Sequence, residues 1–301
     1  MAKLAPKQNT LDTSNLIPSI FIVGFLCVGF IPNWEAVDKI APQWLYLSLL
    51  NLCCGVYIFI NRKSFKDRIA FVLSSWMSIS YITFVIWAAL SYFYAINPTE
   101  VLVNIVRHFN TLFMFLHMGV FIYHIKQKNR LLSIAITLIL TIEVYAVLEQ
   151  ALEMFKAGAI IPGELKGVTA NRNITAFSIA IKIPYVLYLI IKNQKLWLRI
   201  LYMFLTFLSL FCLSMIQSRA SFVAASIIGI LILFWTTFQF LKSKNIKDFI
   251  PNLFYLLPLI LALVLNQILI SDKGADAIAR AATISISQSD GSIDKRLRYY
   301  E

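Results

Sequence analysis

Charged residues are scarce in this 301-residue sequence: Asp, Glu, Lys and Arg together make up 14% of it, whereas hydrophobic residues make up 59%. Soluble globular domains carry roughly 25% charged residues, so the composition argues against a soluble enzyme or a soluble binding domain. Several apolar runs also reach the roughly 20 residues that a helix needs to cross a bilayer. The sequence therefore predicts a membrane protein.

Motifs of several enzyme classes are also missing. The sequence contains no Gly-rich nucleotide-binding loop and no nucleophile elbow around a serine, which argues against an ATP-driven pump and a serine hydrolase. Its four cysteines lie inside apolar runs, which favours small packed side chains over disulfides or metal ligands. His108, His117 and His124 spread over roughly 24 Å of one predicted helix, too far apart to share a metal ion. We expect neither a metal nor a cofactor.

Nine apolar runs are present instead. Because the backbone must satisfy its own hydrogen bonds in lipid, each run predicts a helix. The expected fold is an all-α polytopic membrane protein with about nine transmembrane helices over residues 16–270. Residues 1–15 form an N-terminal segment, and residues 271–301 are polar. The runs cover residues 16–34, 41–60, 69–94, 101–125, 131–152, 174–191, 199–217, 220–241 and 249–270.

The connecting segments alternate in charge. Four of them are basic and fall on one side of the predicted bundle, while the intervening segments lack this excess. The positive-inside rule therefore places the basic segments and the N-terminus in the cytoplasm, and it explains the net charge of +12 without a nucleic-acid partner. The basic segments cover residues 61–68, 126–130, 192–199 and 242–247.

Ionisable residues inside or beside the apolar runs gather toward the outer face. Counting 1.5 Å per residue, Glu143 and Lys182 lie at similar depths of roughly 12 to 13 Å, so an ion pair between them is possible. Arg107 and His108 lie about 10 Å below the outer end of their helix. Arg172 lies in a long outer loop predicted over residues 153–173, and Arg219 occupies an outer helix junction, where the positive-inside rule does not predict cations.

Two interpretations of these residues are open. In the first, they line an outer cavity that binds an anionic head group, a lipid pyrophosphate being the natural ligand, because the planar fork of arginine holds phosphate oxygens bidentately. In the second, Glu143 and Lys182 only neutralise each other, and the arginines extend into the head-group layer. We favour the first for Arg172 and Arg219 and the second for Glu143 and Lys182.

Three short segments resemble the O-antigen ligase and O-antigen polymerase superfamily of bacterial membrane glycosyltransferases. Residues 166–176 (KGVTANRNITA) are similar to the family's Gly and Asn-x-Asn segment, which leads into a helix containing a proline, here Pro184. Residues 217–221 (QSRAS) resemble its Ser-Arg helix junction, and residues 295–300 (KRLRYY) resemble the start of its large periplasmic loop. The resemblance covers most of the chain.

This resemblance implies transfer of a glycan from undecaprenyl pyrophosphate to an acceptor sugar, such as the lipid A core, during cell-surface polysaccharide or lipopolysaccharide synthesis. It implies no nucleotide and no metal, and it places the protein in the bacterial inner membrane. Arg219, with Arg172 or Arg298, would bind the pyrophosphate and stabilise the charge that develops on it. Further cavity-lining candidates are Asn171, Asn173, Arg107, His108, Glu143 and Lys182.

The chain departs from the family in one respect. The family's periplasmic loop supplies a histidine thought to activate the acceptor hydroxyl, and no such residue occurs before Glu301. No catalytic base is therefore assigned. We expect the chain to be the N-terminal part of a longer protein, with residues 271–301 as the truncated start of the periplasmic loop. The alternative is a transporter or flippase of lipid-linked oligosaccharides, in which Glu143 and Lys182 belong to a coupling or substrate path.

Overall fold

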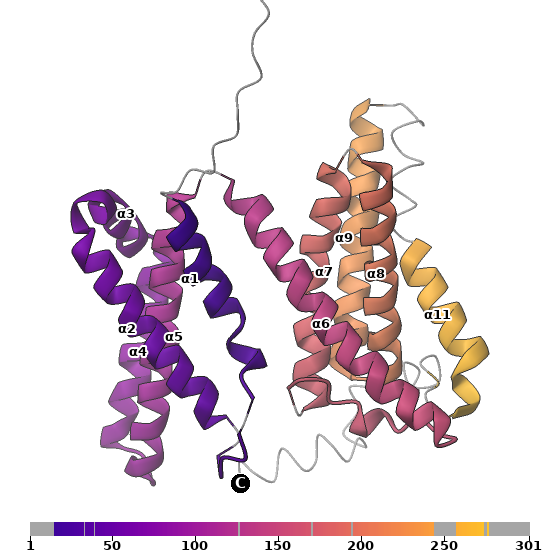
Figure 1. Ribbon diagram of the computed structural model, residues 1–301, viewed down its shortest axis with the longest axis horizontal. Helices are drawn as coiled ribbons and strands as arrows, with labels where there is room; N and C mark the ends of the chain where they lie inside the picture. Colours follow the sequence, from indigo (N-terminus) through magenta and orange to yellow (C-terminus); the bar gives the residue numbers. More distant parts are fainter. Residues whose placement is uncertain are drawn as a thin grey trace, which may run out of the picture. The chain divides into compact units, whose positions relative to one another are not determined.

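The computed structural model describes residues 15–273, apart from residues 33, 39, 126, 170, 194 and 244–256, together with residue 276. The chain forms two compact units, Met1–Ala135 and Ile136–Glu301, here called unit 1 and unit 2. Helices are the only regular secondary structure in the described part of the chain (Figure 1). The predicted all-α architecture is confirmed in these residues.

Unit 1 is built around the long helix α5, which packs against the other helices of the unit. Its core is apolar and aromatic, with Ile22, Phe65 and Phe121 almost completely buried. The elements of unit 1 are α1 (Leu16–Leu26), η2 (Val28–Phe30), α2 (Ala41–Ile60), α3 (Arg62–Ser74), α4 (Trp76–Leu90), η3 (Ser91–Phe93) and α5 (Pro98–His124).

Helix α6 (Lys128–Lys156) begins in unit 1 and continues into unit 2. In unit 2, α8 packs against both α7 and α11, and α7 also packs against α9. The core lies among these helices and contains the fully buried side chains of Leu140, Ile179 and Ile216. The other elements of unit 2 are η4 (Pro162–Glu164), α7 (Arg172–Lys192), α8 (Leu196–Ile216), α9 (Arg219–Ser243), α11 (Leu257–Leu269) and η6 (Ser271–Lys273).

Six of the described helices are long and apolar enough to cross a membrane, which supports a multi-pass membrane protein with the lipid bilayer as its partner. Much of their apolar surface faces outward, as Leu52, Trp87 and Phe204 do, and lipid is the surrounding that such surface fits. The six are Ala41–Ile60, Trp76–Phe93, Pro98–His124, Lys128–Lys156, Arg172–Lys192 and Leu196–Ile216.

The first predicted run is shorter as a helix than its composition suggested. Helix α1 ends at Leu26 and not near residue 34. Ile31 is extended (φ −67°, ψ 121°), because the ring of the following Pro32 disfavours helical geometry in the residue before it. Trp34 and Glu35 then adopt positive φ angles of 42° and 60°, so the chain turns here.

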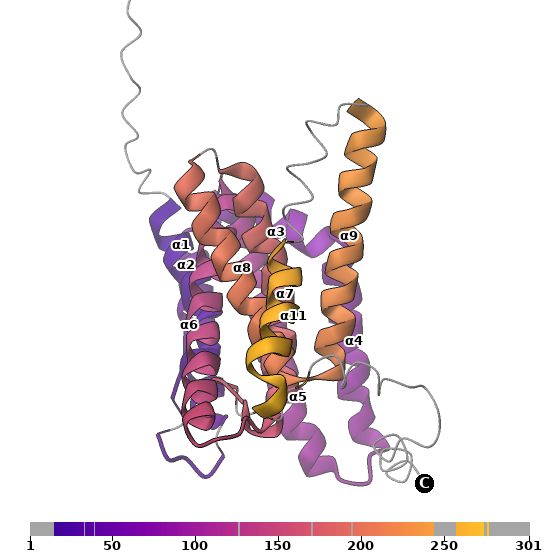
Figure 2. The same ribbon diagram turned by 90° about the vertical axis from the view of Figure 1, so that its right-hand side faces the viewer.

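The third predicted run, residues 69–94, is two helices. Ser75 is extended (ψ 141°), and its Oγ accepts a hydrogen bond from the Ser78 backbone N–H at 3.2 Å, which caps the start of α4. The residues before Ser75 belong to α3, which also includes most of the basic segment predicted as a connection. Helix α3 is seen nearly end-on in Figure 1 and from the side in Figure 2, so it lies across the ends of its neighbours in unit 1.

Candidate functional site

The site begins with the segment that leads into α7. Asn171 is extended (φ −138°, ψ 118°), and its side chain accepts a hydrogen bond from the Asn173 backbone N–H at 2.9 Å. This is the arrangement of an N-cap, in which a side-chain oxygen satisfies a free N–H of the first turn. Arg172 is therefore the first residue of the helix, at its partially positive end.

A second segment, between α8 and α9, is a very short turn. Gln217 closes α8 in the left-handed conformation (φ 53°, ψ 35°), and α9 begins two residues later at Arg219. Gln217 and Ser218 are 8% and 2% exposed. A left-handed conformation is unfavourable for a residue with a side chain and tends to occur at functional sites, so this turn is a strained, buried element of the fold.

One hydrogen bond joins the two segments: the Ser218 hydroxyl donates to Asn173 Oδ1 at 3.0 Å. Asn173 directly follows Arg172, and Ser218 directly precedes Arg219. The first turns of α7 and α9 therefore start at the same end of unit 2, and each starts with an arginine. The side chain of Arg219 lies outside the described part of the chain, whereas that of Arg172 is partly buried and its Nη1 lies near Gly163 in η4.

Gln150 on α6 holds the loop that precedes α7. Its Oε1 accepts hydrogen bonds from the backbone N–H groups of Lys166 (3.1 Å) and Gly167 (2.9 Å), and its Nε2 donates to the Gly167 carbonyl at 3.3 Å. One side-chain amide thus satisfies three backbone groups. Sequence reasoning missed Gln150, because a glutamine near the end of an apolar helix looks like an ordinary interfacial residue.

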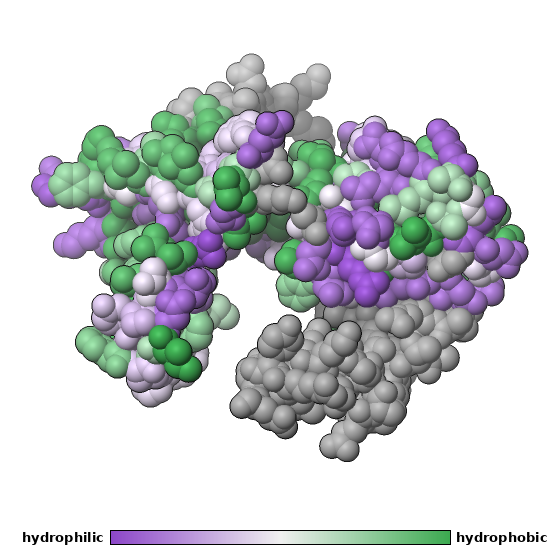
Figure 3. All heavy atoms as spheres, turned by 90° about the horizontal axis from the view of Figure 1, so that it is seen from below, coloured by the Kyte–Doolittle hydropathy of each residue, from purple (hydrophilic) through white to green (hydrophobic). Residues whose placement is uncertain are grey.

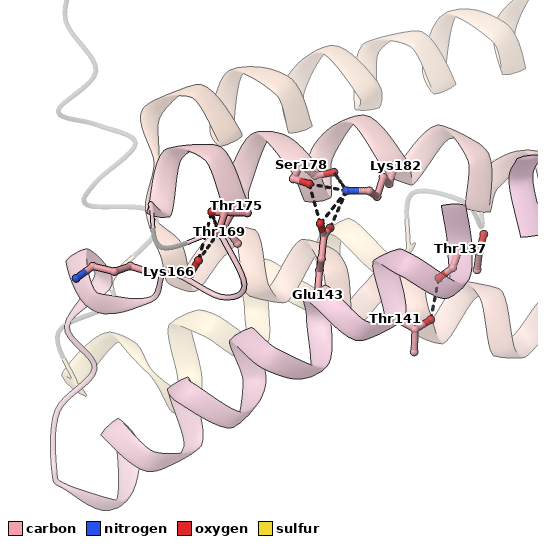
Figure 4. Close-up of polar contacts among 8 residues, drawn as sticks. All are labelled: Thr137, Thr141, Glu143, Lys166, Thr169, Thr175, Ser178 and Lys182. Atoms are coloured by element: carbon pink, nitrogen blue, oxygen red, sulfur yellow. Dashed lines mark hydrogen bonds and ion pairs between the residues drawn. The ribbon is translucent and has the colours of Figure 1, made fainter. Parts of the chain in front are cut away.

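Two threonines hold the same loop from the other side, as Figure 4 shows. The hydroxyl groups of Thr169 and Thr175 lie 2.6 Å apart, and Thr175 also donates to the Lys166 carbonyl. Thr175 is buried on the first turn of α7. Residues 166, 167 and 169 of the loop are therefore held by hydrogen bonds to both α6 and α7, close to Asn171 and Arg172 at the start of α7.

Gly167 is a point where the loop tolerates no side chain. Its φ is +53°, and an added Cβ would lie 3.0 Å from Thr175 Cγ2 and 3.1 Å from Val147 Cγ2. Gly167→Ala should lower the free energy of unfolding by about 2–3 kcal/mol, because left-handed geometry costs an alanine about 1–2 kcal/mol and the close contacts add to it. Thermal unfolding of the detergent-purified protein measures this.

Gly163→Ala in the same loop is the matched control. An added Cβ there would meet only Arg172 Nη1, at 3.9 Å, which is ordinary van der Waals contact. We expect a change within about 0.5 kcal/mol, because the added methyl group creates no clash and leaves no polar group unpaired. Equal unfolding temperatures for the two variants would mean that the loop is not packed as described.

Lys273, which follows α11, contacts the beginning of this loop and the end of α6. The Ile160 N–H donates to the Lys273 carbonyl at 2.6 Å, and the Lys273 ammonium lies 5.6 Å from the centre of the Phe155 ring. Within the loop itself, the Lys166 ammonium pairs with the Glu164 carboxylate at 2.7 Å on the surface. Figure 3 views the end of unit 2 at which α7 and α9 start, and hydrophilic side chains gather there over much of the coloured surface on the right.

Glu143 and Lys182 form a buried ion pair, the contact that their predicted depths made possible. The Lys182 Nζ lies 2.9 Å and 2.8 Å from the two carboxylate oxygens, and the side chains are only 15% and 6% exposed. Ser178 adds a hydrogen bond to Glu143 at 2.8 Å (Figure 4). Lys182 follows Arg172 by ten residues, about 15 Å along α7, so the pair lies deeper in unit 2 than the two arginines.

The remaining candidates, Arg107 and His108, belong to unit 1. Arg107 pairs with Asp38 at 3.2 Å and lies 5.7 Å from the Trp44 ring centre, while His108 packs edge-on against Phe84. Arg107 thus already has a carboxylate partner. Arg107 and His108 lie in unit 1, whereas Glu143 and Lys182 lie in unit 2, and the gathering of all four residues toward the outer face stays a prediction.

Arg298, the third predicted pyrophosphate ligand, lies outside the described residues. Within those residues, no three His, Cys, Asp or Glu side chains lie close enough to hold a metal ion. Comparison of the chain with protein-family models, with curated proteins and with solved structures found no match. The candidate site therefore depends on its own geometry: two helix starts, two arginines and a loop fixed in place by hydrogen bonds.

Proposed function

We propose that this protein is a membrane glycosyltransferase of the O-antigen ligase or polymerase type. It transfers a glycan from undecaprenyl pyrophosphate to an acceptor sugar at the periplasmic face of the bacterial inner membrane. The acceptor is a glycan such as the lipid A core, and the pathway is cell-surface polysaccharide synthesis. The proposal needs neither a nucleotide nor a metal.

The Ser218–Asn173 hydrogen bond is the observation that carries this proposal. It connects two of the three segments that resemble the family, although the bonded residues lie 45 positions apart in the sequence. Each of these two segments contains the arginine that begins a helix, α7 or α9. Guanidinium groups and the N-terminal N–H groups of helices both favour phosphate oxygens, so this end of unit 2 suits a pyrophosphate.

The reaction follows from that placement. The acceptor hydroxyl oxygen attacks the anomeric carbon of the donor sugar, the bond from that carbon to the phosphate oxygen breaks, and the pyrophosphate leaves with the electron pair. Arg172 and Arg219 stabilise the negative charge that grows on the leaving group. Arg298 is a third proposed ligand. A general base takes the proton of the acceptor hydroxyl, and we assign that role to no residue of this chain.

The topology that we propose has nine spans and a cytoplasmic N-terminus. The spans are the six long apolar helices together with α1, α9 and α11. This order puts the starts of α7 and α9 on the periplasmic side and α3, with its four Lys and Arg residues, on the cytoplasmic side. The positive-inside rule supports this orientation.

A transporter or flippase of lipid-linked oligosaccharide is the second candidate, and the buried Glu143–Lys182 pair is the observation in its favour. Ionisable residues inside a membrane often mark a substrate or proton path. However, each charge of this pair already has a partner of opposite sign. We therefore rank transfer chemistry first.

Deletion of the gene separates the two functions. Without a transferase, the lipid-linked glycan should accumulate on the periplasmic side, where an impermeant lectin binds it in spheroplasts, and the acceptor should stay unglycosylated. Without a flippase, the glycan should stay on the cytoplasmic side and become accessible only after lysis. Re-expression of the wild-type protein is the control. Normal glycosylation in the deletion strain would contradict both functions.

A further inference from the structure

Unit 1 contains a groove that the proposed glycan transfer does not use. Helices α2, α3 and α5 surround it, and its volume is about 370 Å³, within the range of small-molecule sites. Its walls are almost entirely apolar, and Gly55 provides space on the α2 side. Phe59, Leu73 and Phe113 on its walls are 69%, 45% and 48% exposed, so the groove is open to the surroundings.

His117 belongs to the wall of the groove. Its Nδ1 lies 3.1 Å from Asn51 Oδ1, and its ring stacks against Phe25 and Phe113. Asn51 in turn donates to the Asn110 carbonyl at 2.9 Å. This network fixes the imidazole between aromatic rings, so His117 lines the groove as a packed side chain.

Arg62 is the only Lys or Arg residue that lines the groove. Its guanidinium carbon lies 5.5 Å from the centre of the Phe59 ring, which is also part of the wall, and a cation over a ring face is held there by the ring's negative face. Arg62 is exposed and makes no ion pair among the described residues. The groove thus combines an apolar interior with one available positive charge.

The position of helix α3 places the Arg62 guanidinium at the level of the lipid head groups. The helix lies across the ends of its neighbours in unit 1 (Figures 1 and 2), with Phe65 and Val72 buried against them. Its first half carries Arg62, Lys63, Lys66 and Arg68 and a single carboxylate, Asp67. An amphipathic basic helix at the ends of membrane spans lies in the head-group layer, where it attracts anionic lipid.

We propose that the groove binds one anionic phospholipid. The phosphate lies at Arg62 in the head-group layer, and one acyl chain follows the apolar wall past Gly55 toward Phe113. A guanidinium can hold two phosphate oxygens at once, and the surplus of positive charge on α3 favours a lipid with net negative charge over a zwitterionic one. The site is independent of the glycosyltransferase proposal, because all of its residues lie in unit 1.

Native mass spectrometry of the detergent-purified chain tests the site, with phosphatidylglycerol and phosphatidylethanolamine of identical acyl chains as probes. The wild-type protein should bind phosphatidylglycerol at least fivefold more tightly. Arg62→Gln should abolish that preference. Lys63→Gln, which removes the same charge from the neighbouring position outside the groove, should keep the preference within about twofold, because a single exposed charge adds little.

Gly55→Leu fills the groove and should remove tight binding of both lipids. Comparison of Arg62→Gln with Lys63→Gln tests the lipid site even if Gly55→Leu does not fold. Equal losses in these two variants would reduce the effect to general surface charge and overturn the site. Equal wild-type affinity for the two lipids, or tight binding retained by folded Gly55→Leu, would overturn it as well.

Discussion

Replacing Arg219 by alanine should lower glycan transfer by about 10²–10³-fold, the usual cost of removing one preorganised group that stabilises transition-state charge. The reason is its place as the first residue of α9, directly after Ser218, whose hydroxyl bonds to Asn173 beside Arg172. The measurement is transfer of a lipid-linked glycan to its acceptor by membranes that contain the variant protein. Expression in those membranes is quantified in parallel.

Two further variants sharpen this test. Arg219→Lys keeps the charge but loses the bidentate fork, so a partial loss is expected. Arg199→Ala removes an arginine near the opposite end of α8 and should leave transfer unchanged. Full transfer by a normally expressed Arg219→Ala protein would count decisively against the proposed role.

Breaking the Glu143–Lys182 pair should destabilise the protein strongly. Glu143→Gln or Lys182→Met leaves the other charge buried without a partner of opposite sign, which typically costs about 3–5 kcal/mol. The double variant removes both charges and should recover most of that loss, giving a large coupling in a double-mutant cycle. Thermal unfolding of the four proteins in detergent measures the coupling, and additive losses would contradict it.

The same double variant separates a structural pair from a functional one. If the two charges serve only to neutralise each other inside unit 2, the double variant should fold and transfer glycan at near wild-type rates. If they form a coupling path, it should fold and be inactive. Ser178, which also contacts Glu143, stays in place in both cases and keeps the local helix packing comparable.

The long apolar helices were predictable from the sequence because hydrophobic length alone determines them. The Glu143–Lys182 contact was foreseeable as well, since the rise per residue gives both side chains similar depths. The break at Ser75 was not, because one serine within an apolar run changes hydropathy little although its side chain caps a new helix. Hydropathy also cannot show that the first residues of this run belong to α3, which lies across the ends of its neighbours in unit 1.

The sequence predicted individual residues of the candidate site, but it did not predict which of them contact one another. Arg172 and Arg219 stood out as cations where the positive-inside rule predicts none. The bond between Asn173 and Ser218 depends on how α7 packs against α9, which no local pattern encodes. Gln150 gave no signal because its partners are backbone groups, and Asp38 looked like an ordinary loop residue although it pairs with Arg107.

The proposed pyrophosphate site requires that residues 172 and 219 both lie on the periplasmic side of the membrane. The direct measurement is labelling of single cysteines in intact cells with a membrane-impermeant maleimide, in a variant without the four native cysteines. Positions 172 and 219 should react before lysis, whereas position 63 on α3 and position 192 at the end of α7 should react only after it. Labelling of 172 and 219 only after lysis would contradict the account.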